Sequence, residues 1–216
     1  GVGKTEAAMV PLFHRLLEKE TKPISVLYIT PLRSLNRDML RRLEDIGSEL
    51  NVSVAVRHGD TSQAERSRQS RNPPQILITT PETLQIMLSG KRLRKNLSGV
   101  EAVVIDEVHE LASSERGAQL SIALERLTLL AGDFQRVGLS ATVGTPKEVS
   151  SFLVGDRPVK ILTPKLERNM DLLVHAPEPV SDDDELVNEL YWEPERVAAL
   201  RYSAEASEMG PTLLFV

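Results

Sequence analysis

The chain has 216 residues, of which 41% are hydrophobic and 26% are charged. This size supports one well-buried core and the beginning of a second. The sequence contains no cysteine, which excludes disulfide bonds, thiolate zinc sites and cysteine nucleophiles. Its start carries no secretory or transit segment, and no apolar run approaches the roughly 18 residues of a membrane span. We therefore expect a soluble, cytoplasmic protein that makes no contact with a membrane.

The formal net charge of −5 at pH 7 is unevenly distributed along the chain. Residues 1–162 carry a small excess of basic side chains, whereas residues 163–216 are strongly acidic. The acidic run Asp182–Glu185 should form a solvated linker or a helix start, because consecutive carboxylates do not easily converge on one ion. The overall acidity is therefore compatible with nucleic-acid binding by the first part of the chain.

Strand and helix patterns alternate through the first three quarters of the sequence. Apolar, β-branched runs predict buried strands at 24–30, 52–57, 75–79, 102–105 and 135–139. Helical patterns occur at 6–20, 33–50, 62–70, 116–130 and 146–154. Repeated strand–helix units of this kind predict an α/β fold with a mostly parallel sheet and helices on both faces.

Several local signals refine this prediction. Pro11 should kink the first helix or delay its start, and Asp60 or Thr61 should cap the helix that begins near residue 62. The basic run Lys91–Lys95 is typical of a solvated surface turn. Thr80 followed by a proline is a helix-start signature, and such a start also offers backbone N–H groups to an anion.

The pattern changes beyond residue 163, where prolines and the acidic run separate short segments. We predict a first domain at residues 1–163 and a linker with the start of a second domain at residues 164–210. The apolar stretch 211–216 should be the opening strand of that second domain.

Two stretches indicate phosphate chemistry. The sequence begins inside a pattern of the type G-x-x-x-x-G-K-[ST], with GVGKT at residues 1–5. In such a loop, backbone N–H groups and a lysine bind phosphates, and a hydroxyl binds Mg²⁺. The predicted strand at 102–105 ends in Asp106 and Glu107, at the sheet edge where open α/β folds bind ligands. Together these stretches predict a site in which ATP phosphates lie between Lys4 and Asp106, with Mg²⁺ bridging.

Five stretches fall in the order and spacing of motifs I, Ia, Ib, II and III of superfamily 2 helicases. They are GVGKT at 1–5, TPLRSLN at 30–36, TTPETL at 79–84, DEVH at 106–109 and LSAT at 139–142. The details TPLRSLN, RHGDTS and DEVHEL most resemble the Lhr (large helicase-related) proteins of archaea and bacteria. The resemblance implies a RecA-like P-loop NTPase domain truncated at both ends, with the first strand of a second RecA-like domain at 211–216.

Roles follow from this resemblance by position. Lys4 would bind the β- and γ-phosphates, Thr5 and Asp106 would hold Mg²⁺, and Glu107 would activate the attacking water, which makes Lys4, Asp106 and Glu107 the catalytic residues. The nucleotide-binding set would be Gly1, Val2, Gly3, Lys4, Thr5, Asp106 and Glu107. The residues coupling the nucleotide state to the nucleic acid would be His109, Ser140 and Thr142. The nucleic-acid-binding set would be Arg33, Gly59, Thr80, Pro81 and Glu82.

The expected protein is an ATP-dependent helicase or translocase with ATP and Mg²⁺ as cofactors and a setting in DNA repair. Its partner would be single-stranded DNA or RNA, with DNA favoured, and no obligate protein partner is evident. A duplex translocase that does not unwind, an RNA helicase and a non-enzymatic binding module stay open as alternatives. A small-molecule kinase shares the phosphate loop but has no need of the TPLR, TTPET and SAT stretches. We expect residues 1–216 alone to be inactive in unwinding, with at most trace ATP hydrolysis.

Overall fold

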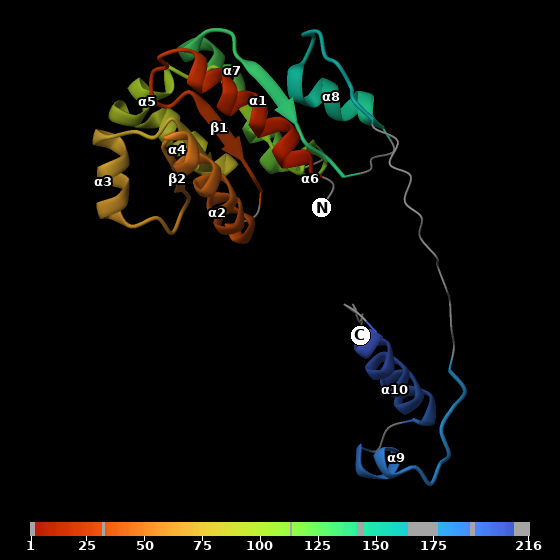
Figure 1. Ribbon diagram of the computed structural model, residues 1–216. Coiled ribbons are helices and arrows are strands. Elements are labelled where there is room, and N and C mark those ends of the chain that lie inside the picture. The colour runs from red at the N-terminus through yellow and green to blue at the C-terminus, as the bar shows by residue number, and fades with distance from the viewer. Residues whose placement is uncertain are drawn as a thin grey trace. The chain divides into compact units, whose positions relative to one another are not determined.

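The computed structural model describes residues 3–31, 33–112, 114–141, 145–163, 177–190 and 193–209, without the side chains of residues 33–40, 92, 190 and 206–209. Gly1, Val2, Thr142 and the stretch 211–216 therefore lie outside the described residues, as does the side chain of Arg33. The chain divides into two compact units, Gly1–Thr163 and Pro164–Val216 (Figure 1).

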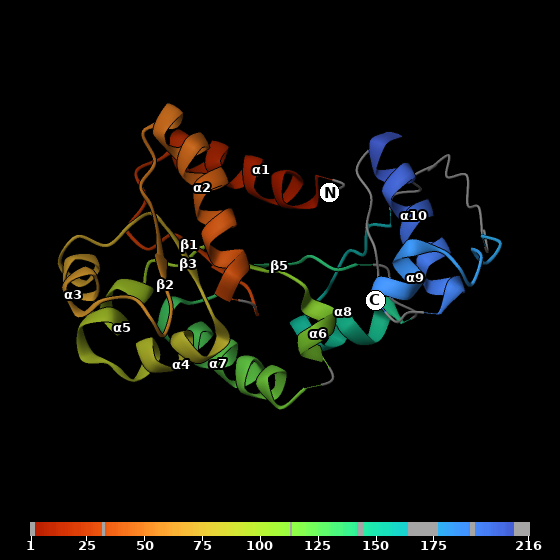
Figure 2. The same cartoon turned by 90° about the horizontal axis from the view of Figure 1, so that it is seen from below.

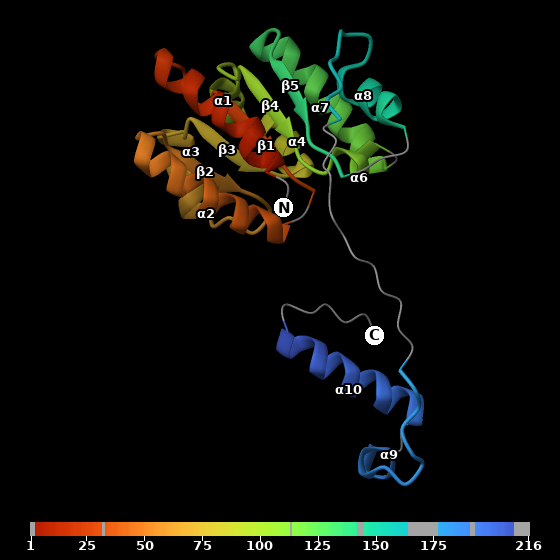
Figure 3. The same ribbon diagram turned by 45° about the vertical axis from the view of Figure 1, so that its right-hand side comes forward.

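The first unit is built on a parallel five-stranded sheet with the order β2-β3-β1-β4-β5. Its strands are β1 (Val26–Ile29), β2 (Val54–Arg57), β3 (Ile76–Thr79), β4 (Ala102–Ile105) and β5 (Gln135–Gly138). The strands lie side by side and point the same way (Figure 3). The prediction of an α/β fold with a parallel sheet is confirmed.

Helices cover both faces of this sheet (Figure 2). One face carries α1 (Lys4–Glu18) and α2 (Arg33–Leu50). The opposite face carries α4 (Pro81–Ser89), α5 (Lys91–Leu97), α6 (Val108–Ala112), α7 (Glu115–Ala131) and α8 (Pro146–Val154). The remaining helix, α3 (Gln63–Arg71), packs beside β2, where Gln69 Nε2 donates to the Val56 carbonyl at 2.9 Å.

Alternation along the strands creates two hydrophobic cores, because successive side chains of a strand point to opposite faces. Tyr28 of β1 and Val104 of β4 belong to the core under α1 and α2. Leu27 and Val103 belong to the core under α4 and α7. All four residues of β1, β3 and β4 are buried, which explains their continuous apolar sequences.

The helix α1 starts at Lys4 and contains Pro11, so its start is not delayed, and the predicted kink stays a prediction. The Pro11 side chain is exposed, so that water can satisfy the carbonyl left without a donor. Two other local predictions were wrong. The run Lys91–Lys95 forms part of α5 because Leu93 and Leu97, four residues apart, are buried in the core. Ser62 caps α3, whereas the Thr61 hydroxyl accepts from His58 N inside the preceding turn.

The second unit contains α9 (Glu185–Leu190) and α10 (Pro194–Met209). Asp184 joins them, because its Oδ1 accepts from the backbone N–H of Leu186 at 3.1 Å and from Arg201 Nη2 at 2.9 Å. The acidic run therefore provides a helix start. Across the described parts of both units, no helix is long and apolar enough to cross a membrane.

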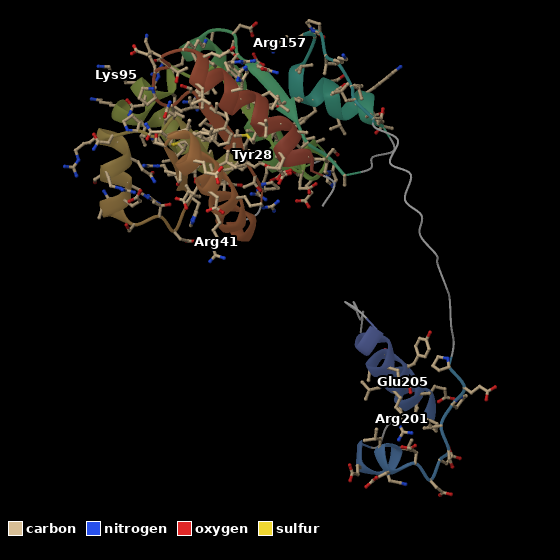
Figure 4. The ribbon with its side chains drawn as sticks, in the orientation of Figure 1. Tyr28, Arg41, Lys95, Arg157, Arg201 and Glu205 are labelled. Atoms are coloured by element: carbon tan, nitrogen blue, oxygen red, sulfur yellow. The ribbon has the colours of Figure 1, made fainter. Side chains whose placement is uncertain are left out.

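Arg157, which Figure 4 labels, belongs to an ion cluster that joins α7, β5 and the segment after α8. Glu125 accepts two hydrogen bonds from Arg157, at 2.9 and 2.8 Å, and its Oε1 lies 3.0 Å from Arg136 Nη2. The Arg136 side chain is only 5% exposed and also donates to the Leu153 carbonyl at 3.0 Å. The hydrogen bonds from Arg157, together with those from Arg136, lower the pKa of Glu125 to about 2.

This cluster should make stability depend on pH in the acid range. The pKa of Glu125 is about 2 in the folded chain against 4.5 for an ordinary glutamate, so its contribution is present above pH 4.5 and is lost as the pH falls toward 2. Glu125→Gln should lower the free energy of unfolding by about 1 kcal/mol at pH 7, since the half-exposed pairs are screened. Urea unfolding of both proteins across this range measures the difference, with Glu44→Gln on α2 as control. A difference of equal size at every pH would contradict the assignment.

Candidate functional site

The carboxyl ends of the strands meet at one edge of the sheet, because all the strand pairs are parallel. Gly59 follows β2 and Thr80 follows β3, whereas Asp106 follows β4 and Ser140 follows β5. The strand order β2-β3-β1-β4-β5 places the predicted nucleic-acid-binding positions toward one end of this edge. The predicted nucleotide-binding positions lie toward the other end, and β1 separates the two groups.

Asp106 is a buried carboxylate at the end of β4, with 8% of its surface exposed. Its Oδ2 accepts a hydrogen bond from the Tyr28 hydroxyl at 2.7 Å, and its Oδ1 accepts one from the backbone N–H of Glu107 at 3.0 Å. The Asp106 backbone N–H donates to the Ile29 carbonyl at 2.8 Å, which continues the pairing of β4 with β1. Both oxygens of the carboxylate are therefore held in place.

Glu107 leaves the strand in a left-handed backbone conformation, with φ at 44°. This conformation costs a non-glycine residue about 1–3 kcal/mol, and such strain concentrates at functional sites. Within the described part of the chain, Glu107 Oε2 is buried without a hydrogen-bond partner. It lies 3.4 Å from Nδ1 of His109 on α6. The two adjacent carboxylates thus differ: Asp106 is fixed by hydrogen bonds, and Glu107 has a buried oxygen that accepts no hydrogen bond from the described residues.

The helix α1 begins at the same edge. Gly3 precedes it with φ at 69°, a conformation that favours glycine. Lys4 Nζ donates to the Ser140 carbonyl at 2.7 Å, which joins the start of α1 to the end of β5. The Thr5 side chain interacts with the hydroxyl of Tyr28, the residue that also binds Asp106. The fold therefore brings Lys4, Thr5, Asp106 and Ser140 together.

The predicted contact between His109 and the Ser140–Thr142 turn stays a prediction. The contact recorded for His109 is with Glu107, and Ser140 Oγ is buried without a hydrogen-bond partner among the described residues. The backbones of the two segments are nevertheless linked, since Val108 N–H donates to the Leu139 carbonyl at 2.9 Å.

The oxygen donors at this edge suit a divalent cation that arrives with phosphate. Among the described residues no group of three or more His, Cys, Asp or Glu side chains could hold a metal ion by itself. Mg²⁺ commonly binds to one or two carboxylates and completes its shell with phosphate oxygens and water. The Thr5 hydroxyl and the Asp106 carboxylate therefore fit a Mg²⁺ ion bound together with a nucleotide, and they do not form a cage built from protein alone.

Gly59 lies in a turn after β2 that side-chain hydrogen bonds stabilise. Thr61 Oγ1 accepts from the His58 backbone N–H at 2.9 Å, and Arg66 Nη2 donates to the Gly59 carbonyl at 2.7 Å. Arg66 comes from α3, and its buried Nε has no hydrogen-bond partner within the described residues. This arginine was not predicted, and it places a positive charge beside Gly59 at the carboxyl edge.

The side chains at the start of α4 are mostly buried and therefore offer little surface for direct contact with a ligand. Thr80 is 4% exposed, and its Oγ1 accepts from the Thr83 backbone N–H at 3.4 Å, as the predicted helix cap requires. Pro81 is buried as well. Thr80 and Pro81 therefore shape the backbone at this position, while their side chains lie mostly below the surface.

Glu82 is held by an arginine that was not in the predicted nucleic-acid-binding set. Arg116 Nε donates to Glu82 Oε1 at 2.5 Å, and Arg116 Nη2 donates to the Pro31 carbonyl at 3.0 Å. Arg116 on α7 thus connects the start of α4 with the loop between β1 and α2. Two of the stretches predicted to bind nucleic acid are joined by this one side chain.

A depression of about 810 Å³ lies at the opposite edge of the sheet, beside the residues that precede β4 and β5. Its charged groups pair with one another: Lys19 Nζ lies 2.8 Å from Glu101 Oε2, and Arg15 donates to Gln135 Oε1 at 2.8 Å. The strained backbone and the unpartnered carboxylate lie at the carboxyl edge instead. The carboxyl edge is therefore the stronger candidate.

Comparison with known proteins shows the family of this chain. A family model for DEAD/DEAH box helicases matches residues 1–152. The chain belongs to the DEAD/DEAH box helicase family. It is 42% identical over 205 residues to the Lhr helicase/uracil glycosylase of Escherichia coli, a match that covers 85% of this chain and 13% of that protein. It is 40% identical over 215 residues to the ATP-dependent helicase Lhr-Core of Methanothermobacter thermautotrophicus, covering 88% of this chain and 25% of that protein.

A solved structure agrees with this assignment. The Mycobacterium smegmatis helicase Lhr bound to ssDNA and AMP-PNP matches with a TM-score of 0.74 and 37% identity, covering 93% of this chain and 27% of that chain. The resemblance to Lhr helicases predicted from the motifs is confirmed. This DEAD/DEAH box chain spans between 13% and 25% of the length of the two curated relatives.

Removing the Thr80 hydroxyl should destabilise this helicase domain. Thr80→Val should lower the free energy of unfolding by about 1 kcal/mol, because the Thr83 N–H at the start of α4 loses its acceptor. Thr145 occupies the corresponding position before α8 but makes no side-chain cap hydrogen bond, so Thr145→Val should change stability little. Urea unfolding followed by circular dichroism measures both variants. Equal losses from the two would show that the cap is not what Thr80 contributes.

Proposed function

We propose that this chain is the ATP-binding domain of a helicase that uses ATP hydrolysis to move along a single strand of nucleic acid, with DNA as the favoured strand. The observation that carries the proposal is the meeting of Lys4, Thr5, Asp106 and Glu107 at one sheet edge. A relative named ATP-dependent helicase and the Lhr structure bound to ssDNA and AMP-PNP support it.

The nucleotide half works through charge and position. Lys4 binds the β- and γ-phosphates, while the N-terminal turn of α1 adds backbone N–H groups that favour an anion. The Thr5 hydroxyl and the Asp106 carboxylate would hold Mg²⁺, which would supply positive charge against the phosphates. Glu107 Oε2 accepts a proton from a water whose oxygen bonds to the γ-phosphorus. The bond from that phosphorus to the bridging oxygen breaks, and ADP leaves with the electron pair.

The end of β5 couples the nucleotide state to the nucleic-acid-binding side. Lys4 Nζ is bound to the Ser140 carbonyl in this structure. A bound phosphate that attracts Lys4 competes with the Ser140 carbonyl for this side chain. Loss of the hydrogen bond would release Ser140 and the two residues that follow it, Ala141 and Thr142. His109, next to Glu107 in space, completes the coupling set.

The nucleic-acid half lies beyond β1. Arg33 and Arg66 supply positive charge, and Gly59 lets the strand backbone approach closely. Thr80, Pro81 and Glu82 shape the loop that faces the strand. Such contacts go to phosphate and sugar, so they carry little base specificity.

An arginine from outside residues 1–163 should complete the ATP site. In this class of motor, an arginine that meets the transferring phosphate contributes about 10³–10⁵ in rate. Arg116 is engaged with Glu82 and Pro31, and Arg136 is engaged with Glu125. We therefore assign this arginine to a second RecA-like domain, which would begin after the linker, with residues 211–216 as its first strand.

Glu107→Gln tests the division of roles between the two carboxylates. The amide still contacts water but cannot take its proton, so ATP binding should persist while hydrolysis falls about 100-fold or more. The measurement is ATP turnover by the domain joined to a second RecA-like domain, with single-stranded DNA, with RNA and with neither.

The matched control is Glu110→Gln, because Glu110 is exposed on α6 close to the site. This control should keep the parental rate. Parental turnover by Glu107→Gln would place water activation elsewhere, and equal stimulation by RNA would remove the preference for DNA.

A further inference from the structure

Tyr28 is a polar residue in an otherwise aliphatic buried strand. The strand β1 reads Val-Leu-Tyr-Ile, and Tyr28 is 0% exposed. Its ring packs in the core under α1 and α2, where Figure 4 marks it. A buried tyrosine hydroxyl needs a hydrogen-bond partner, and aliphatic packing alone would be served equally well by phenylalanine.

The hydroxyl of Tyr28 connects two side chains that belong to different motifs. It donates to Asp106 Oδ2 at 2.7 Å. The Thr5 side chain, from the start of α1, interacts with the same hydroxyl. The phenol is the donor in its bond to Asp106, and the carboxylate oxygen is the acceptor.

From this geometry we propose that Tyr28 is a positioning residue that orients Thr5 and Asp106 for Mg²⁺-dependent nucleotide binding. The inference rests on the function proposed above, in which these two side chains hold the metal. Asp106 Oδ1 is held by the Glu107 backbone, so the bond from Tyr28 to Oδ2 fixes the plane of the carboxylate. The same phenol fixes the direction of the Thr5 hydroxyl, on the opposite side of the site.

Tyr28→Phe removes this hydroxyl and keeps the ring. Asp106 Oδ2 then loses its donor in a buried position, and the carboxylate is free to rotate. Loss of a hydrogen-bond partner behind a metal ligand typically lowers metal affinity about 10–100-fold. We expect the Mg²⁺ concentration for half-maximal binding of a fluorescent AMP-PNP derivative to rise at least about ten-fold. Binding of the same nucleotide in EDTA should stay unchanged, because Lys4 and the helix terminus are untouched.

The control is Ile78→Val in β3. Ile78 is paired in register with Tyr28 and packs in the same core, but it has no polar atom. This variant should lower thermal stability without moving the Mg²⁺ dependence. Two results would show that Tyr28 is a structural residue only. In the first, Tyr28→Phe weakens nucleotide binding equally with and without Mg²⁺. In the second, the parent protein needs Mg²⁺ for binding and Tyr28→Phe shows the same Mg²⁺ dependence.

A double variant and a direct observation separate the possible failures. Tyr28→Phe combined with Asp106→Asn should bind Mg²⁺-nucleotide no more weakly than Asp106→Asn alone, since Tyr28 acts through Asp106. Proton NMR should show a slowly exchanging Tyr28 hydroxyl that shifts in Asp106→Asn, and its absence would overturn the inference by itself. A wild-type chain that shows this proton but binds nucleotide without any dependence on Mg²⁺ would overturn the proposed function and the role of Tyr28 with it.

Discussion

The buried carboxylate of Asp106 is the constraint on which the site depends. A carboxylate taken out of water is costly unless hydrogen bonds and nearby positive groups compensate for the lost hydration. Here the compensation comes from the Tyr28 hydroxyl and from the Glu107 backbone N–H. The first of these donors reaches Asp106 because β1 and β4 are paired in parallel and in register. The second comes from the turn that follows β4. The position of this carboxylate therefore depends on the strand pairing of the sheet.

The central strand β1 lies between the two proposed halves of the site. Its Tyr28 binds Asp106 on the proposed nucleotide side, and the Pro31 carbonyl just after the strand binds Arg116, which also holds Glu82 on the proposed nucleic-acid side. The strand and the residues just after it thus contact both halves. Release of Lys4 from Ser140 would act on the end of β5, which is joined to β1 through β4.

The sequence predicted features that depend on local pattern. Apolar runs located the strands, and the order of the motifs located Lys4, Asp106 and Glu107 at one edge. It could not predict contacts between distant segments, such as Tyr28 with Asp106 or Arg116 with Pro31. A tyrosine in a strand predicted to be fully buried was nevertheless a usable signal, because its hydroxyl had to find a partner. The basic run at 91–95 was wrongly predicted to be a surface turn, because its charges were given more weight than the spacing of Leu93 and Leu97, which makes the segment helical.

The most direct test is amide hydrogen exchange with and without AMP-PNP and Mg²⁺. The predicted result is slower exchange in the first turn of α1, in residues 106–110 and at Ser140, all at the carboxyl edge of the sheet. Residues 98–101 and 133–135, which border the depression at the opposite edge, should exchange as before. Slower exchange confined to those two segments would contradict the placement of the nucleotide site, and with it the roles assigned to Lys4, Asp106 and Glu107.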